Sequence, residues 1–143
     1  MKRTIILLTI FSISLITLAQ NTSKGGNTNA TTEKKAMKLG IVIYSNDAET
    51  VWNAFRLANY SLAEGDSVSV FLLGKGVEAQ TVSTKDFDVK EKMEDFSTSG
   101  GKIFACGTCL RQRNQEGSKL CPVSSLSDLY DIIKKSEKVD ITL

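Results

Sequence analysis

Short apolar runs alternate with segments of helical period along residues 38–143, and this alternation limits the fold more than any other feature. Leu39–Tyr44 is a continuous apolar run of the kind that a strand buried on both faces shows. Ser67–Leu73 and Lys102–Ala105 are further runs of strand length. No hairpin signal such as Asn-Gly joins two of these runs, so helices are expected to connect neighbouring strands. The pattern predicts a three-layer α/β/α sandwich, with a mostly parallel sheet of about five strands.

Two segments between the first three strands have the period and the end signals of helices. Apolar side chains recur at helical spacing over Ala48–Glu64, directly after the cap residues Ser45-Asn-Asp47. Asp88 is placed to cap a second helix, in which Val89, Met93 and Phe96 form one face. Between them, Gly74-Lys-Gly76 indicates a tight turn into a short helical piece.

The end of the chain predicts a short strand, a helix and a final strand. We expect the short strand at Lys119–Cys121 and the final one at Val139–Leu143. Ser125-Leu-Ser-Asp128 has the form of a capping box for the helix, which should run to about Lys135. The period of this helix assigns to its buried face Leu126, Leu129 or Tyr130, and Ile133.

The first residues have the pattern of an export signal. Two positive charges in Met1–Arg3 precede the uncharged apolar run Thr4–Leu18, and small residues end the segment at Ala19. The run is shorter than the roughly 20 residues that a membrane-spanning helix needs. We therefore expect a signal peptide at residues 1–19, export to the periplasm and no stable membrane insertion after cleavage. Residues 20–37, which are mostly polar, are expected to form a disordered linker before the domain at 38–143.

The composition excludes several classes of function. The chain has 18 basic and 16 acidic residues. Since Lys2 and Arg3 belong to the leader, the domain is balanced in charge and lacks the basic surface of a nucleic-acid-binding protein. The absence of histidine excludes Ser-His and Cys-His catalytic pairs, and also zinc sites with histidine ligands. Cysteine is left as the strong nucleophile, and no cofactor is indicated.

Two of the three cysteines lie where a strand is expected to meet a helix. Lys102–Ala105 leads into Cys106, a glycine turns the chain, and Cys109 falls in an expected short helix over Thr108–Asn114. A thiol at such a junction faces free backbone N–H groups and the positive end of the helix dipole, and both favour the reactive thiolate.

Other candidate residues follow the strands of the expected sheet, because ligands of parallel sheets bind at the carboxyl ends of the strands. The candidate binding residues at this end are Asn46, Gly74, Gly76, Gly107, Arg111 and Arg113. The two arginines add positive charge to the thiols if they fold back over the turn. Cys121 falls at the same end, as a core residue or as a further thiol of the pocket.

The residues alone leave several interpretations of the thiols open. Cys-x-x-Cys is the signature of thioredoxin-like dithiol–disulfide exchange, but the Trp or Pro usual beside that motif is missing here. A zinc site would need a carboxylate or another subunit to complete four ligands, so no metal site is predicted. If Cys106 and Cys109 are both buried in the core, they are inert.

Four segments together resemble the DsrE/DsrF-like family of small sulfur-handling proteins. These segments are Lys38–Tyr44, Leu72–Val77, Lys102–Arg113 and Leu120–Tyr130. The resemblance extends over essentially the whole domain. It implies a parallel α/β/α sandwich, commonly assembled as trimers or hexamers, and a function in sulfur relay.

Position by position, the resemblance implies that Cys106 carries sulfur as a persulfide and that Arg113 is the basic residue that follows it. Cys109 makes the motif a Cys-x-x-Cys variant, and Cys121 lies where some members have a cysteine. The leading hypothesis is a sulfur carrier or sulfurtransferase-like protein, with a sulfur donor and acceptor as partners and a homo-oligomer as its working form. Dithiol–disulfide exchange through Cys106 and Cys109, and a non-catalytic oligomeric binding module, are the alternatives. Export separates this chain from the cytoplasmic relays of the family.

Overall fold

The structure is a computed structural model that describes residues 35–142. The expected signal peptide and the expected linker up to residue 34 lie outside the described residues. The described residues all belong to one compact unit. Met37 already belongs to this domain, since its N–H donates to Asp66 Oδ1 at 2.9 Å and its carbonyl accepts from the Ser67 N–H at 2.8 Å.

Five strands form one sheet in the order β4-β3-β2-β1-β5. The strands are β1 (Lys38–Ile43), β2 (Ser67–Leu72), β3 (Lys102–Cys106), β4 (Val123–Ser124) and β5 (Lys138–Thr142). Every pairing between them is parallel, so their carboxyl ends lie at one end of the sheet. The five-stranded parallel sheet predicted from the sequence is confirmed.

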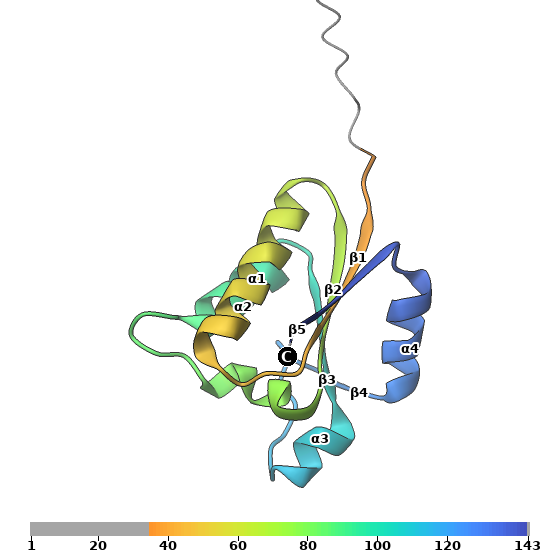
Figure 1. Ribbon diagram of the computed structural model, residues 1–143. Coiled ribbons are helices and arrows are strands. Elements are labelled where there is room, and N and C mark those ends of the chain that lie inside the picture. The colour runs from red at the N-terminus through yellow and green to blue at the C-terminus, as the bar shows by residue number, and fades with distance from the viewer. Residues whose placement is uncertain (1–34, 143) are drawn as a thin grey trace, which may run out of the picture. The chain divides into compact units, whose positions relative to one another are not determined.

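Helices cover both faces of this sheet, as Figure 1 shows. α1 (Ala48–Ala63) and α2 (Val89–Thr98) lie on one face, and α4 (Leu126–Lys135) lies on the other. The chain passes from β1 to β2 and β3 in one direction and returns from β4 to β5 in the opposite one. Right-handed crossovers therefore place α1 and α2 on one side and α4 on the other. The result is the predicted three-layer α/β/α sandwich.

Two short helices lie at the carboxyl ends of the strands. The 3₁₀ helix η1 (Gly74–Thr81) follows β2, and α3 (Gly107–Gln112) follows β3 without a break. The sequence predicted both short helices, one after Gly74-Lys-Gly76 and one after Cys106.

Helix caps and aromatic packing hold the α1–α2 layer on the sheet. Asp47 Oδ1 accepts from the Thr50 N–H at 2.8 Å at the start of α1, and Asp88 Oδ1 accepts from the Glu91 N–H at 3.0 Å at the start of α2. The largest fully buried side chains are Phe55, Phe71, Phe96, Ile41, Ile43, Leu72 and Met93. Each stabilises the fold by about 1.5–3 kcal/mol through burial.

The short fourth strand lies later in the chain than the sequence predicts. Lys119–Cys121 was expected to be the strand, but Val123–Ser124 pairs with β3 instead. A turn occupies the expected position, because the Ser118 N–H donates to the Cys121 carbonyl and Ser118 Oγ accepts from the Cys121 N–H, both at 3.0 Å. The prediction was wrong because apolar character alone does not reveal such a serine-closed turn.

α4 buries less of its apolar face than the sequence predicts. Leu129 is buried, but Leu126, Tyr130 and Ile133 are 64%, 60% and 44% exposed. Of the alternatives Leu129 and Tyr130, Leu129 is the buried one. The prediction was wrong for Leu126 and Ile133, because α4 is the only described helix on its face of the sheet. No neighbouring described helix covers the outer flank of α4.

The turn after β2 depends on the absence of a side chain at Gly76. A Cβ at this position would lie 2.0 Å from the Ile43 carbonyl oxygen, which accepts from the Leu73 N–H at 2.9 Å. We predict that Gly76→Ala lowers the free energy of unfolding by about 2–4 kcal/mol, because a backbone atom cannot give way easily. Urea unfolding measures this loss.

Gly65→Ala is the matched control for this substitution. Gly65 has φ +89°, and no atom lies within 4 Å of the Cβ that alanine would add. Only the backbone strain of the left-handed conformation remains, which costs about 1–2 kcal/mol. Equal losses in the two variants would contradict the steric explanation for Gly76.

Candidate functional site

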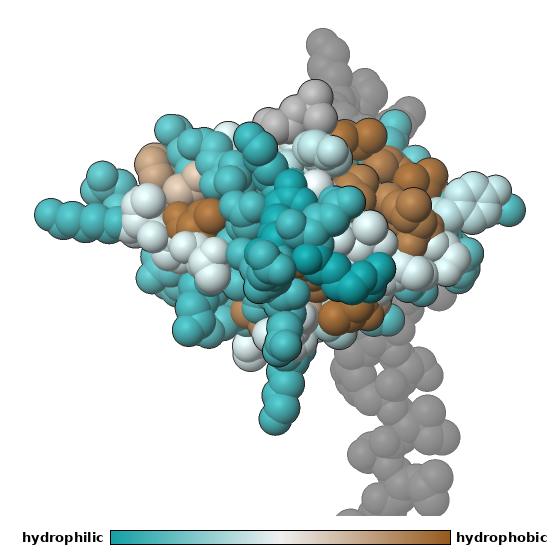
Figure 2. Space-filling view, turned by 90° about the horizontal axis from the view of Figure 1, so that it is seen from below, coloured by the Kyte–Doolittle hydropathy of each residue, from teal (hydrophilic) through white to brown (hydrophobic). Residues whose placement is uncertain are grey.

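A cleft of about 710 Å³ opens at the carboxyl ends of the strands. Its walls come from the end of β2, the turn from β3 into α3, and the segment from β4 into α4. Figure 2 views the molecule from this end and shows apolar groups on the right-hand side, where α4 lies in Figure 1. The lining residues are Leu73, Cys106, Gly107, Thr108, Cys109, Arg111, Val123, Ser124, Ser125, Leu126 and Asp128.

Cys106 lies at the junction that the sequence predicts. It is the last residue of β3 and occupies the N-cap position of α3, with an extended backbone. It pairs with Ser124 of β4 and is only 4% exposed, yet it lines the cleft. Because β3 is held between β2 and β4, the sheet fixes the position of this sulfur.

Cys109 lies beside Cys106 on the first turn of α3. Its Sγ accepts from the Gly74 N–H at 3.2 Å, and the neighbouring Cys106 thiol is close enough to affect its pKa. Burial, and then the contact with Cys106, raise the pKa of the Cys109 thiol, while the Gly74 N–H and the charge of Arg113 oppose this rise. Both thiols are free. Two adjacent thiols can form a disulfide, or one can attack a sulfur atom that the other holds.

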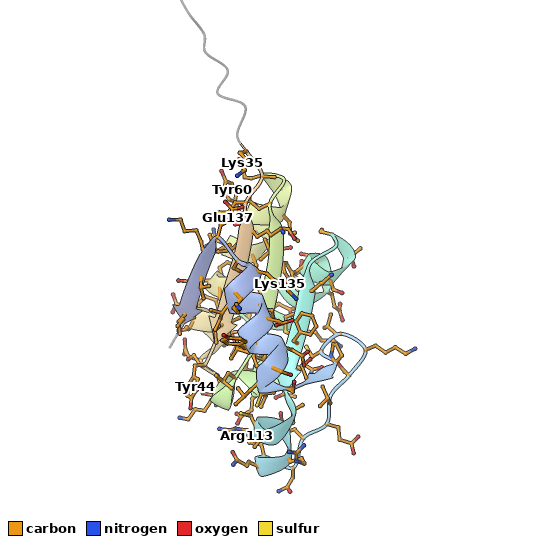
Figure 3. All side chains as sticks on the ribbon, turned by 90° about the vertical axis from the view of Figure 1, so that its right-hand side faces the viewer. Lys35, Tyr44, Tyr60, Arg113, Lys135 and Glu137 are labelled. Atoms are coloured by element: carbon orange, nitrogen blue, oxygen red, sulfur yellow. The ribbon has the colours of Figure 1, made fainter. Side chains whose placement is uncertain are left out.

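The two arginines fold back over the turn but make different contacts. Arg111 Nη2 donates to Thr108 Oγ1 at 3.2 Å, and Arg111 Nη1 lies 3.5 Å from where a Cβ on Gly107 would be. Arg113 points the other way: its Nε donates to Glu78 Oε1 at 2.9 Å and its Nη1 to the Cys109 carbonyl at 3.3 Å. Figure 3 shows Arg113 beside α3 at this end of the sheet. Arg111 therefore lines the cleft, while Arg113 connects α3 to η1.

Glu78 of η1 is the site residue that the sequence analysis missed. Its Oε2 accepts from Asn46 Nδ2 at 2.8 Å, and its Oε1 accepts from Arg113. The hydrogen bond from Asn46, followed by the guanidinium of Arg113, lowers the pKa of Glu78. The Glu78 carboxylate thus links three parts of the chain: η1 itself, the segment that follows β1, and the end of α3. An acidic residue in a short helical piece gives no signal by itself, because its partner Arg113 lies far along the chain.

Gly74 and Gly76 support the site without lining the cleft. The Gly74 N–H reaches the sulfur of Cys109, and its φ is +58°. A Cβ at Gly74 would lie 2.5 Å from the Tyr44 ring. Of the candidate residues, the structure brings Cys106, Gly107, Cys109 and Arg111 to the cleft. Asn46, Gly74, Gly76 and Arg113 hold the surrounding segments together.

Cys121 lies away from the cleft. It is fully buried, its backbone N–H donates to Ser118 Oγ at 3.0 Å, and burial raises the pKa of its thiol to about 12. Such a thiol is protonated and a poor nucleophile at neutral pH. Of the two positions that the sequence left open for Cys121, the structure therefore favours the core.

Neither a metal cluster nor a membrane span is found within residues 35–142. No group of three or more Cys, Asp or Glu side chains in this range is arranged to hold a metal ion. No helix in the same range is both long and apolar enough to cross a bilayer.

Comparison with known proteins gives one family and several relatives. A profile of the DsrE/DsrF-like family matches residues 37–140. Uncharacterized protein MJ0989 of Methanocaldococcus jannaschii is 28% identical over 97 residues, which is 64% of this chain and 85% of that protein. Uncharacterized protein MK0008 of Methanopyrus kandleri is 29% identical over 100 residues, which is 64% of this chain and 80% of that protein.

A solved structure has a similar fold. The ychN protein from E. coli aligns with a TM-score of 0.66 and 18% sequence identity, over 73% of this chain and 98% of that chain. At this identity the likeness supports the fold alone.

We predict that the protein loses stability at alkaline pH because of the buried thiol of Cys121. An unfolded thiol has a pKa of about 8.5, whereas the pKa of Cys121 in the folded state is about 12. The folded state therefore keeps a proton that the unfolded state releases. The stabilisation is fully present below about pH 8.5 and is lost as pH rises towards 12, by up to about 1.4 kcal/mol per pH unit. Urea unfolding across this pH range measures the loss.

Cys121→Ala provides the comparison, because it lacks the thiol. The small void lowers its stability at every pH, but its alkaline loss should be shallower than that of the wild type. Cys109 titrates in both proteins, so its effect cancels in the difference. Parallel pH profiles would contradict a buried, protonated Cys121.

Proposed function

The chain belongs to the DsrE/DsrF-like family, and we propose that it is a sulfur carrier that holds sulfane sulfur as a persulfide on Cys106. The observation that carries this proposal is the position of Cys106, at the end of β3 on a cleft that it shares with a second thiol, Cys109. The Cys106 thiolate attacks the sulfane sulfur of a donor. The bond inside the donor breaks, and the donor's remainder leaves with the electron pair.

The surroundings of Cys106 suit a persulfide. Cys106 is only 4% exposed, so a sulfane sulfur bound to it is shielded from most solutes. The guanidinium of Arg111 lies over Gly107, next in the chain to Cys106, and adds positive charge near a persulfide anion. Cys109, whose pKa is raised by burial, is a neutral thiol that can donate a hydrogen bond to this anion.

The persulfide on Cys106 has two possible fates in this cleft. A thiol acceptor can attack its outer sulfur and take it away, which regenerates Cys106. Alternatively, the thiolate of Cys109 attacks the inner sulfur, forms a Cys106–Cys109 disulfide and releases sulfide. The adjacency of the two thiols also favours a second candidate function, dithiol–disulfide exchange without any sulfur carrier step.

Substitution of single cysteines separates these functions. After incubation with a polysulfide, we expect a mass increase of one sulfur atom on the Cys106 peptide, absent in Cys106→Ser. Cys109→Ser should keep the adduct for longer, because the resolving thiol is lost, and Cys121→Ala should behave like the wild type. Mass mapping of the alkylated protein from the exported fraction measures the adduct and shows whether residues 1–19 have been removed.

Two results would contradict the carrier. One is an unmodified Cys106 with a reversible Cys106–Cys109 disulfide, which would favour dithiol exchange. The other is an adduct that persists in Cys106→Ser, which would place the sulfur on another residue. In either case the proposed role of Cys106 would be lost.

We further propose that the working form is a homo-oligomer that covers the α4–β5 surface. Tyr130 and Ile133 of α4 are exposed, and so are Val139 and Ile141 of β5 at 39% and 61%. Exposed apolar groups on an edge strand and its preceding helix are typical of a contact surface. The family resemblance leads us to expect a trimer or hexamer.

A charge placed on this surface should break the oligomer. We predict that Tyr130→Lys converts the wild-type trimer or hexamer into monomers, because a lysine cannot be buried without a partner. Light scattering after gel filtration measures the mass. Leu57→Lys, on the exposed side of α1 where Leu57 is 45% exposed, is the control and should leave the mass unchanged. A monomeric wild type, or equal effects of both variants, would contradict the proposal.

A further inference from the structure

The charged groups on the cleft indicate which sulfur donor it accepts. We infer that the donor is a low-molecular-weight persulfide of amino-acid type, with a carboxylate and an ammonium group beside its sulfane sulfur. The inference rests on the proposed function of Cys106 and adds the chemical class of the molecule that loads it.

The size of the cleft suits a small organic molecule. Its volume of about 710 Å³ lies within the range of about 300–1,000 Å³ that small-molecule sites occupy. Apolar side chains, Leu73, Val123 and Leu126, line it together with hydroxyl and charged groups. Such a lining offers contacts to the carbon atoms of an organic donor, which an inorganic sulfur compound does not have.

Arg111 provides a cation on the α3 side of this cleft. Its hydrogen bond to Thr108 Oγ1 uses one donor group, and it has no carboxylate partner among residues 35–142. The remaining N–H groups of its guanidinium are free to bind a carboxylate with two parallel hydrogen bonds. Arg113 differs in this respect, because Glu78 already neutralises it.

Asp128 provides an anion on the α4 side of the same cleft. Its Oδ2 accepts from the Ser125 N–H at 2.8 Å and from Ser125 Oγ at 2.9 Å. These hydrogen bonds lower the pKa of Asp128, so it stays ionised at neutral pH. No described residue donates to its Oδ1, which leaves this oxygen available to an ammonium group.

The two charges together favour a zwitterion. Arg111 and Asp128 come from different walls of the cleft and have opposite signs. A molecule with one carboxylate and one ammonium group can pair with both. A dianion such as thiosulfate can pair with Arg111 but is repelled by Asp128. Cys106 and Cys109 line the same cleft, where they can meet the sulfane sulfur of such a zwitterion.

The transfer needs no further reactant. Cys106 Sγ forms a bond to the terminal sulfur of the donor, and the S–S bond of the donor breaks. The donor leaves as its thiol with the proton that Cys106 gave up, and Cys106 becomes the persulfide. One S–S bond replaces another, so there is no net oxidation or reduction.

Four donors and two variants test the inference. Cysteine persulfide has both charges, cysteamine persulfide lacks the carboxylate, N-acetylcysteine persulfide lacks the ammonium group, and thiosulfate is the inorganic dianion. The rate of sulfur addition to Cys106 is measured by mass for the wild type, Arg111→Gln and Asp128→Asn. Lys119→Gln, which removes an exposed charge away from the cleft, is the control.

We expect cysteine persulfide to load the wild type fastest. Arg111→Gln should slow the two carboxylate-containing persulfides about tenfold and leave cysteamine persulfide unchanged. Asp128→Asn should slow cysteine and cysteamine persulfides about tenfold and leave N-acetylcysteine persulfide unchanged. Ratios between donors within one variant do not depend on how much of that variant is folded. Lys119→Gln should match the wild type with every donor.

Two other results would overturn the inference, and they are distinguishable. If Cys106 gains sulfur from all four donors at rates that neither variant changes selectively, the donor class is wrong while the carrier function stands. If none of the donors modifies Cys106, both the proposed carrier function and the proposed donor class are wrong.

Discussion

The approach of the turn after β2 to the Ile43 carbonyl is the contact on which the site depends. This oxygen accepts from the Leu73 N–H at 2.9 Å and leaves no space for a side chain on Gly76. The contact sets where η1 begins relative to the end of β1. From that position the Gly74 N–H reaches Cys109, and Glu78 reaches Arg113. A backbone contact inside the sheet thus determines which groups meet the thiols.

Polar contacts between α3 and η1 fix the short helix that directly follows Cys106. α3 has only 6 residues, and an isolated helix of that length is unstable in water. Arg113, held by Glu78, donates to the Cys109 carbonyl, and Cys109 in turn accepts from η1. The half-buried ion pair contributes about 1 kcal/mol or less to stability. Its main effect is geometric: it fixes α3 while Arg111 remains available to the cleft.

The sequence predicted the scaffold better than the details of the site. Continuous apolar runs, helical periods and cap residues located β1 to β3 and α1 and α2, and they placed Cys106 at a strand end, because these signals are local. The Glu78–Arg113 pair could not be predicted, since no local signal relates residues that only the sheet brings together. The different contacts of Arg111 and Arg113 depend on the bounds of α3, which are Gly107–Gln112 rather than the expected Thr108–Asn114. The exposed flank of α4 was missed because helical period shows an apolar face but not what covers it.

The unequal environments of the thiols decide how a persulfide on Cys106 would be used. Cys109 is close enough to resolve it, but burial and the neighbouring Cys106 raise the pKa of Cys109, so little thiolate is present at neutral pH. Attack by Cys109 on the persulfide is therefore slow compared with attack by an acceptor that arrives as a thiolate. The Gly74 N–H and Arg113 limit this rise, so Cys109 keeps some reactivity. In the proposed mechanism, Cys106 delivers its sulfur when an acceptor is present, and Cys109 releases it as sulfide when none arrives.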